Sequence, residues 1–181
     1  MKIMGKKVLV VSSTLRNGGN SLALAEAFAS GVRESGNDVE FVSLKNKDIR
    51  FCTGCLTCQK THKCPIPDDV SKIIDLMRVS DVLAFATPVY FYGISGQLKT
   101  FLDRTNPIFS SKYNFRDIYL LGAAADADEG AIDGAITALN GWISCFNGTK
   151  LKGVVCGAGA TDVGEISADK LKEAMDMGKS V

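Results

Sequence analysis

Four of the six cysteines fall within thirteen residues, at Cys52, Cys55, Cys58 and Cys64, and Pro65 follows the last of them. Three thiolates spaced by three residues can surround one iron–sulfur cubane, and a nearby fourth completes the ligand set. The spacing is close to that of ferredoxins, whose last cysteine also precedes proline. Structural zinc more often uses two Cys-x2-Cys pairs set well apart. The motif therefore favours a [4Fe-4S] site, with free thiols or a disulfide, and zinc, as the alternatives.

The other two cysteines and the single histidine have simpler explanations. Cys145 lies on an apolar helical segment, and Cys156 ends an apolar strand-like run. We expect both in the core, because a free cysteine behaves as a small hydrophobic residue. His62 lies inside the cysteine loop, where we expect it to be exposed to solvent.

A second polar group, at residues 12–21, separates an apolar strand from the start of a helix. It contains hydroxyls, amides, one guanidinium and two adjacent glycines. A helix N-terminus offers unpaired N–H groups and a positive dipole end, which attract phosphate. The side chains that add donors or positive charge are Ser13, Thr14, Arg16, Asn20 and Ser21. A plain polar turn, with Asn20 or Ser21 as the helix cap, is the alternative.

Three successive aromatic residues, Tyr90, Phe91 and Tyr92, follow a third strand-like run between Pro88 and Gly93. Loops are normally polar, so this composition suits a flat aromatic ligand that needs apolar walls. The alternative is that the rings pack against the end of the sheet or against a partner subunit.

These segments resemble a known family. Pro88 to Gly93, continued by Gly96 to Lys99 and Phe101 to Arg104, is similar to the flavin loop of the NADPH-dependent FMN reductases, in the flavodoxin-like superfamily. Residues 13–21 resemble that family's phosphate loop, although Ser13 and Leu15 replace its usual glycine and proline. The cysteine stretch resembles the iron–sulfur flavoproteins, a branch of the superfamily in which a [4Fe-4S] cluster lies near FMN.

The resemblance implies FMN as the cofactor and NAD(P)H as its reductant. It places the phosphate on Thr14, Arg16, Asn20 and Ser21. It places the isoalloxazine between Pro88, Val89, Tyr90, Phe91, Tyr92 and Gly93. The loop after the fourth strand is expected beside the flavin too, because the small residues Ala124 and Ala125 permit a close approach.

The elements that must position these loops alternate regularly. Apolar runs predict strands at 8–11, 39–44, 82–86, 118–121 and 151–156, and helical periodicity predicts helices between and after them. We expect Asp68 or Asp69, and Ser95, to cap two of those helices. The pattern predicts an α/β doubly wound, mostly parallel sheet of five strands, as one domain over 1–181 with a cysteine-rich loop at 46–69. The resemblance implies a flavodoxin-like strand order of 2-1-3-4-5.

Composition limits the partners. The 21 Lys and Arg nearly balance the 20 Asp and Glu, which argues against nucleic acid and anionic membranes. The sequence contains no apolar run of membrane-spanning length and, near the N-terminus, no signal-peptide pattern, so we expect a cytoplasmic protein. The apolar flavin loop and the long cysteine loop suggest a homodimer or homotetramer.

The expected function is that of an FMN-dependent oxidoreductase, which passes electrons from NAD(P)H to a flavin, a quinone or another small-molecule electron acceptor. Because hydride transfer needs no acid or base, no catalytic side chain is predicted. A close alternative is an electron carrier reduced by ferredoxin. A distant one is a non-catalytic module with a zinc-bound loop.

Overall fold

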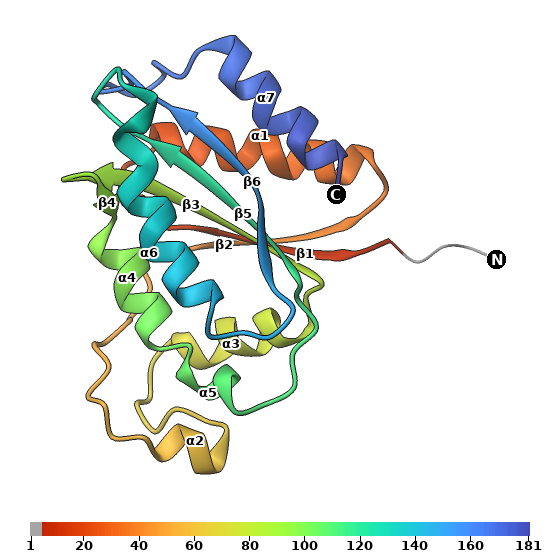
Figure 1. Ribbon diagram of the computed structural model, residues 1–181, viewed down its shortest axis with the longest axis vertical. Helices are drawn as coiled ribbons and strands as arrows, with labels where there is room; N and C mark the ends of the chain where they lie inside the picture. The colour runs from red at the N-terminus through yellow and green to blue at the C-terminus, as the bar shows by residue number, and fades with distance from the viewer. Residues whose placement is uncertain (1–4) are drawn as a thin grey trace.

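The computed structural model describes residues 5–181 and contains a parallel sheet between two layers of helices (Figure 1). The first four residues of the predicted domain lie outside that range. The parallel strands are β1 (Lys7–Ser12), β2 (Asp38–Ser43), β3 (Val82–Tyr90), β5 (Asp117–Ala123) and β6 (Lys150–Gly157). Their order, β2-β1-β3-β5-β6, is 2-1-3-4-5 among the parallel strands. The predicted flavodoxin-like class is therefore confirmed. A short strand that was not predicted, β4 (Gly93–Ile94), pairs antiparallel with β3.

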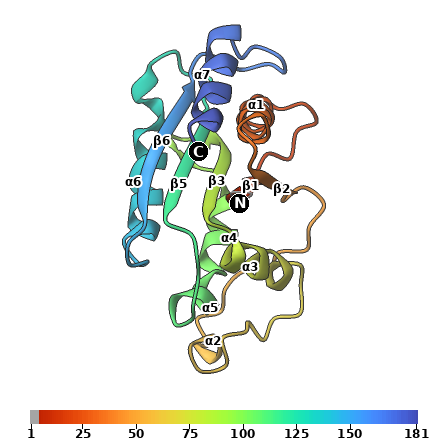
Figure 2. The same ribbon diagram turned by 90° about the vertical axis from the view of Figure 1, so that its right-hand side faces the viewer.

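The helices cover both faces of the sheet (Figure 2). α1 (Asn20–Glu34) and α7 (Ala168–Lys179) pack on one face; α3 (Val70–Val79), α4 (Gly96–Asp103) and α6 (Asp133–Ile143) pack on the other. Successive β1 side chains alternate between the two cores, with Val8 and Val10 toward α1 and with Leu9 and Val11 toward α3 and α4. Burial on both faces explains why β1 is a continuous apolar run.

Shorter elements lie in the connections. α2 (Thr57–Thr61) lies within the long segment between β2 and α3, and α5 (Asn106–Phe109) follows α4. A 3₁₀ turn, η1 (Glu129–Ile132), precedes α6. Ser95 caps α4 as predicted, since its Oγ accepts a hydrogen bond from the Leu98 N–H. Among residues 5–181, the structure has no helix with the length and apolar character needed to cross a membrane.

The parallel strands all end at one edge of the sheet, where their arrowheads lie in Figure 1. The loops that follow β1, β3, β5 and β6 therefore meet at this edge. In a doubly wound sheet this is the position at which ligands bind, and it is where the predicted site residues are found.

Candidate functional site

The loop between β1 and α1 presents donors at the start of α1. Gly19 occupies the N-cap position, and within the described chain no side chain caps the helix there. A Cβ on Gly19 would lie 2.7 Å from Thr14 Oγ1, so glycine allows the loop to fold this closely. Ser21 Oγ is buried, and no described residue gives it a hydrogen-bond partner. An uncapped first turn beside an unpaired buried hydroxyl has the chemistry of an anion site.

Asn20 and Arg16 bind the loop that follows β6. Asn20 Nδ2 donates to the carbonyl oxygens of Ala160, at 3.1 Å, and Asp162, at 2.8 Å. Arg16 Nη1 donates to the carbonyl oxygen of Thr161 at 2.7 Å. Both predicted phosphate contacts therefore also hold a neighbouring loop in place, and Asn20 is buried while doing so.

Two other residues predicted to contact the cofactor, Ser13 and Ala124, are buried beneath the loops. The Ser13 hydroxyl is buried, 3.0 Å from the Ala86 carbonyl oxygen and 2.9 Å from Ser95 Oγ. Ala124 is also buried, and its N–H donates to the Gly157 carbonyl at 3.0 Å. Ser13 thus joins the ends of β1 and β3, and Ala124 joins the ends of β5 and β6.

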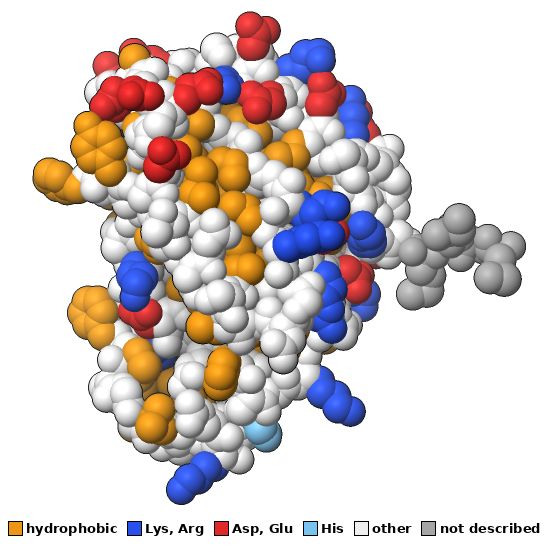
Figure 3. Space-filling view, viewed as in Figure 1, with side chains coloured by type: hydrophobic (Ala, Val, Ile, Leu, Met, Phe, Trp, Pro, Cys, Tyr) orange, Lys and Arg blue, Asp and Glu red, His pale blue; other side chains and the backbone are white. Residues whose placement is uncertain are grey.

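The aromatic segment after β3 forms a two-residue hairpin. Tyr90 pairs with Gly93, so Phe91 and Tyr92 make the turn, with φ values of 48° and 61°. Hairpin turns of this kind normally contain Asn-Gly, and the left-handed conformation costs other residues about 1–2 kcal/mol each. The Phe91 side chain is fully exposed. Apolar side chains protrude at this edge of the molecule in Figure 3. The strained turn thus presents aromatic surface to solvent.

Tyr92 joins this hairpin to the loop after β5. Its hydroxyl donates to Asp126 Oδ2 at 2.9 Å. This hydrogen bond raises the pKa of Tyr92 above its ordinary value. The pKa of Asp126 is lowered, first by the backbone N–H of Asp128 and then by Tyr92. The carboxylate is therefore ionised at neutral pH and holds the two loops together across the site.

A surface cavity of about 210 Å³ lies among these loops. It has a polar end at the start of α1 and small or apolar residues elsewhere. Its lining residues are Thr14, Arg16, Gly19, Asn20, Ser21, Pro88, Val89, Tyr90, Ala123, Ala125, Ala160 and Thr161. The unpaired Ser21 hydroxyl and the uncapped first turn of α1 fit a phosphate at one end of the cavity. The apolar walls fit a flat ring beyond it.

The four clustered cysteines lie on the segment that contains α2, and all are free thiols. Cys58 is buried and Cys64 is half-buried, whereas Cys52 and Cys55 are exposed. Burial raises the pKa of Cys58. Across residues 5–181, no three His, Cys, Asp or Glu side chains are gathered as metal ligands. The donor set has the chemistry of an iron–sulfur site, but the exposed pair is not folded around a common centre.

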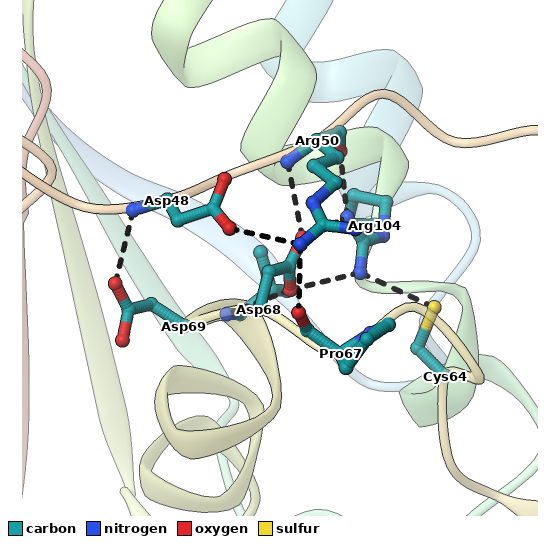
Figure 4. Close-up of polar contacts among 8 residues, drawn as sticks. Asp48, Arg50, Cys64, Pro67, Asp68, Asp69 and Arg104 are labelled. Carbon is teal, nitrogen blue, oxygen red and sulfur yellow. Dashed lines mark hydrogen bonds and ion pairs between the residues drawn. The ribbon is translucent and has the colours of Figure 1, made fainter.

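The base of this cysteine loop is held by a buried ion pair (Figure 4). Arg104 donates to Asp68 through Nη1, at 2.6 Å, and through Nη2, at 3.0 Å, and neither side chain is exposed. Burial opposes the ionisation of Asp68, but hydrogen bonds from Arg104 and from the N–H groups of Arg50 and Val70 outweigh it and lower its pKa. Arg104 also donates to the Arg50 carbonyl at 2.6 Å and to Cys64 Sγ at 3.3 Å. One guanidinium thus joins both ends of the loop.

The prediction that Cys145 is buried is wrong, whereas the predictions for Cys156 and His62 are confirmed. Cys145 is exposed, because α6 ends at Ile143 and the chain turns before the apolar periodicity is complete. Cys156 is buried and His62 is exposed, as predicted. Either Asp68 or Asp69 was predicted to cap α3. Asp69 occupies the N-cap position, but the side chain that accepts a hydrogen bond from the first turn is that of Asp68, whose Oδ1 accepts from the Val70 N–H.

Comparison with known proteins identifies the family. A family model described as NADPH-dependent FMN reductase matches residues 6–162. The chain is 39% identical over 102 residues to an iron-sulfur flavoprotein of Methanocaldococcus jannaschii, covering 56% of this chain and 53% of that protein. It is 28% identical over 180 residues to an iron-sulfur flavoprotein of Archaeoglobus fulgidus, covering 97% of this chain and 78% of that protein. The chain therefore belongs to the NADPH-dependent FMN reductase family, which confirms the resemblance found in its sequence.

Solved structures support the fold. An NAD(P)H:quinone oxidoreductase from Methanothermobacter marburgensis matches with a TM-score of 0.77 at 20% identity, over 97% of this chain and 96% of that chain. At this level of identity the similarity concerns the fold alone. The chain spans about half the length of the Methanocaldococcus jannaschii relative.

The sequence analysis missed four residues that line the cavity: Gly19, Ala123, Ala160 and Thr161. Gly19 was considered only as a turn residue, and Ala123 was placed in the adjacent loop but not assigned to the site. The sequence analysis assigned no role to the loop after β6. The position of that loop at the carboxyl end of a parallel strand was the signal that could have found Ala160 and Thr161.

Proposed function

We propose that the chain is an FMN-dependent oxidoreductase that takes reducing equivalents from NAD(P)H and delivers them to a quinone, a flavin or another small acceptor. The observation that supports it best is the Ser21 hydroxyl, which is buried, unpaired within the described chain and part of the cavity lining. When bound, FMN supplies the hydride and electron chemistry. The chain's own residues bind it, orient it and exclude water.

At the polar end of the cavity, we assign the phosphate of FMN to Thr14, Ser21 and the first N–H groups of α1. A hydrogen bond to a charged group contributes about 1.5–3 kcal/mol, so a few such contacts give strong binding. Arg16 supplies positive charge beside them, and Asn20 acts by holding the loop after β6. We do not place Ser13 in contact with the phosphate, because its hydroxyl is bonded within the sheet.

At the apolar end, we assign the walls around the ring system to Pro88, Val89 and Tyr90, together with Ala123 and Ala125. Small residues allow backbone groups to approach the edge of a flat ligand closely. The ionisable side chains that line the cavity are Arg16 and Tyr90. Hydride transfer from a nicotinamide to a flavin needs no protein acid or base, so we assign no catalytic side chain to that step.

The reductant is tested by anaerobic stopped-flow mixing of the FMN-loaded protein with NADPH, with NADH and, separately, with reduced ferredoxin. The proposal expects at least one nicotinamide to bleach the flavin absorbance rapidly. Fast reduction by ferredoxin, with neither nicotinamide reacting, would favour an electron carrier. This carrier is the second candidate function, because the cysteine motif provides a place for a one-electron centre.

We also propose that Cys52, Cys55, Cys58 and Cys64 bind a [4Fe-4S] cluster. The spacing of the cysteines supports it, and two relatives are iron-sulfur flavoproteins. Cys58 and Cys64 already accept side-chain hydrogen bonds, whereas Cys52 and Cys55 are exposed, so the loop must close as the metal binds. Analysis of anaerobically purified protein should find about four irons and as many sulfides per chain. Zinc, or neither metal, would contradict this assignment.

The functional unit is proposed to be a homodimer or a homotetramer. Figure 1 places α2 at the far end of α4 and α5 from the β3–β4 hairpin. A cluster beside α2 would thus be remote from the flavin cavity of its own chain. Contact between the cysteine loop of one protomer and the exposed hairpin of another would shorten the electron path and cover the Phe91 ring.

A further inference from the structure

Two side chains from one short turn donate hydrogen bonds to cysteine sulfurs. Arg104 is the C-cap of α4, and Asn106 begins α5. Arg104 Nη2 lies 3.3 Å from Cys64 Sγ, and Asn106 Nδ2 lies 3.3 Å from Cys58 Sγ. These sulfurs belong to the two least exposed cysteines of the motif. The turn therefore directs its donors at Cys58 and Cys64, the two cysteines that other residues already contact.

The Arg104 contact is fixed by its surroundings. Its guanidinium is 1% exposed and is held by Asp68 on one side and by the Arg50 carbonyl on another. A planar guanidinium gripped by a carboxylate in this bidentate way has one orientation. That orientation aims an N–H group at Cys64, as Figure 4 shows. Asn106 makes its contact from the first residue of a helix, which also restricts its movement.

We propose that Arg104 and Asn106 are positioning residues of the cysteine site, which hold Cys64 and Cys58 as ligands and raise the reduction potential of the cluster. This inference rests on the proposed [4Fe-4S] cluster. Hydrogen bonds to ligand sulfurs stabilise the more negative, reduced state. Because Asp68 offsets the charge of Arg104, the effect rests on the two hydrogen bonds. Removing either donor should therefore shift the midpoint potential of the cluster to a more negative value.

Asn106→Leu is the cleanest test, because it removes one donor without breaking the buried ion pair. The matched control is Ser110→Ala. Ser110 is the C-cap of the same short helix, and its Oγ contacts His62 Nδ1 and no cysteine sulfur. For Arg104, the double variant Arg104→Met with Asp68→Leu removes the donor and its partner together. Removing both members avoids leaving one buried charge unpaired. Because Asp68 also accepts from the Arg50 and Val70 N–H groups, the unfolding free energy of the double variant is measured beside its potential.

Anaerobic spectroelectrochemistry of the FMN-loaded, iron-loaded protein measures the cluster and flavin potentials in one sample. Asn106→Leu and the double variant should each give a more negative cluster potential than wild type. Ser110→Ala should match wild type, and the flavin potential should be unchanged in all four proteins. The flavin serves as the internal reference because its cavity contains none of these residues.

The outcomes separate this inference from the function on which it rests. A cluster with an unchanged potential in both donor variants would overturn the roles of Arg104 and Asn106 while leaving the cluster assignment intact. A flavin potential that moves together with the cluster potential would indicate a general structural effect and would also overturn them. Wild-type protein that cannot be loaded with iron would overturn the cluster itself.

Discussion

Removing the unpaired hydroxyl of Ser21 should have opposite effects on the stability of the FMN-free protein and on its affinity for FMN. A buried polar group without a partner costs about 1–3 kcal/mol. Ser21→Ala should therefore leave the free energy of unfolding of the FMN-free protein unchanged, or raise it by up to that amount. FMN affinity should fall, because the lost hydrogen bond to a phosphate contributes about 1.5–3 kcal/mol, equivalent to roughly a ten- to hundredfold rise in Kd.

Ser12 supplies the matched control. Its Oγ is also buried and unpaired within the described chain, but Ser12 is the last residue of β1 and is not part of the cavity lining. Ser12→Ala should have the same effect on unfolding and none on FMN. Urea denaturation of the FMN-free proteins measures the first quantity, and fluorescence titration with FMN measures the second. Equal FMN affinity in Ser21→Ala and wild type, or equal weakening by Ser12→Ala, would refute the assignment of Ser21 to the phosphate.

Three further predictions concern the loops around the site. Cys55→Ser should abolish bound iron and leave FMN bound, since the cavity contains no cysteine; full retention of iron by elemental analysis would contradict the ligand set. Asp68→Asn should lower the free energy of unfolding by about 3–5 kcal/mol at neutral pH. Because folding lowers the pKa of Asp68, the difference in unfolding free energy between wild type and Asp68→Asn should persist above the ordinary aspartate pKa of about 3.9 and shrink as pH falls below it. Acid denaturation measures it, and a difference that does not depend on pH would contradict the ion pair. Phe91→Gly should relieve the left-handed strain and raise stability by about 1–2 kcal/mol while weakening self-association in light scattering; an unchanged oligomer would exclude this ring from the interface.

The general location of the site was predictable because it follows from local rules. The apolar runs of β1 and β5 define a buried parallel sheet, and in such a sheet the loops after the strands meet at one edge. The polar residues at 13–21 and the apolar residues at 88–90 could therefore be placed together without knowledge of their contacts. Their grouping in one cavity follows from topology.

The details that were not predicted depend on contacts between distant segments. Arg104 pairs with Asp68, 36 positions away, and periodicity gives no sign of a buried guanidinium. The β3–β4 hairpin was missed because its turn contains Phe91 and Tyr92 in place of the glycine and asparagine that usually mark one. Asn20 was expected to contact phosphate or to cap α1, yet its amide binds the loop after β6. Each of these features is a tertiary interaction that local propensity cannot encode.

The central claim is that the cavity at the start of α1 binds FMN and presents it to a nicotinamide. The most direct measurement is the visible spectrum of the protein after incubation with FMN and removal of the unbound flavin, recorded anaerobically before and after adding NADPH or NADH. The account predicts flavin bands that bleach on addition of at least one nicotinamide. A folded protein that stays colourless after incubation with FMN would contradict it.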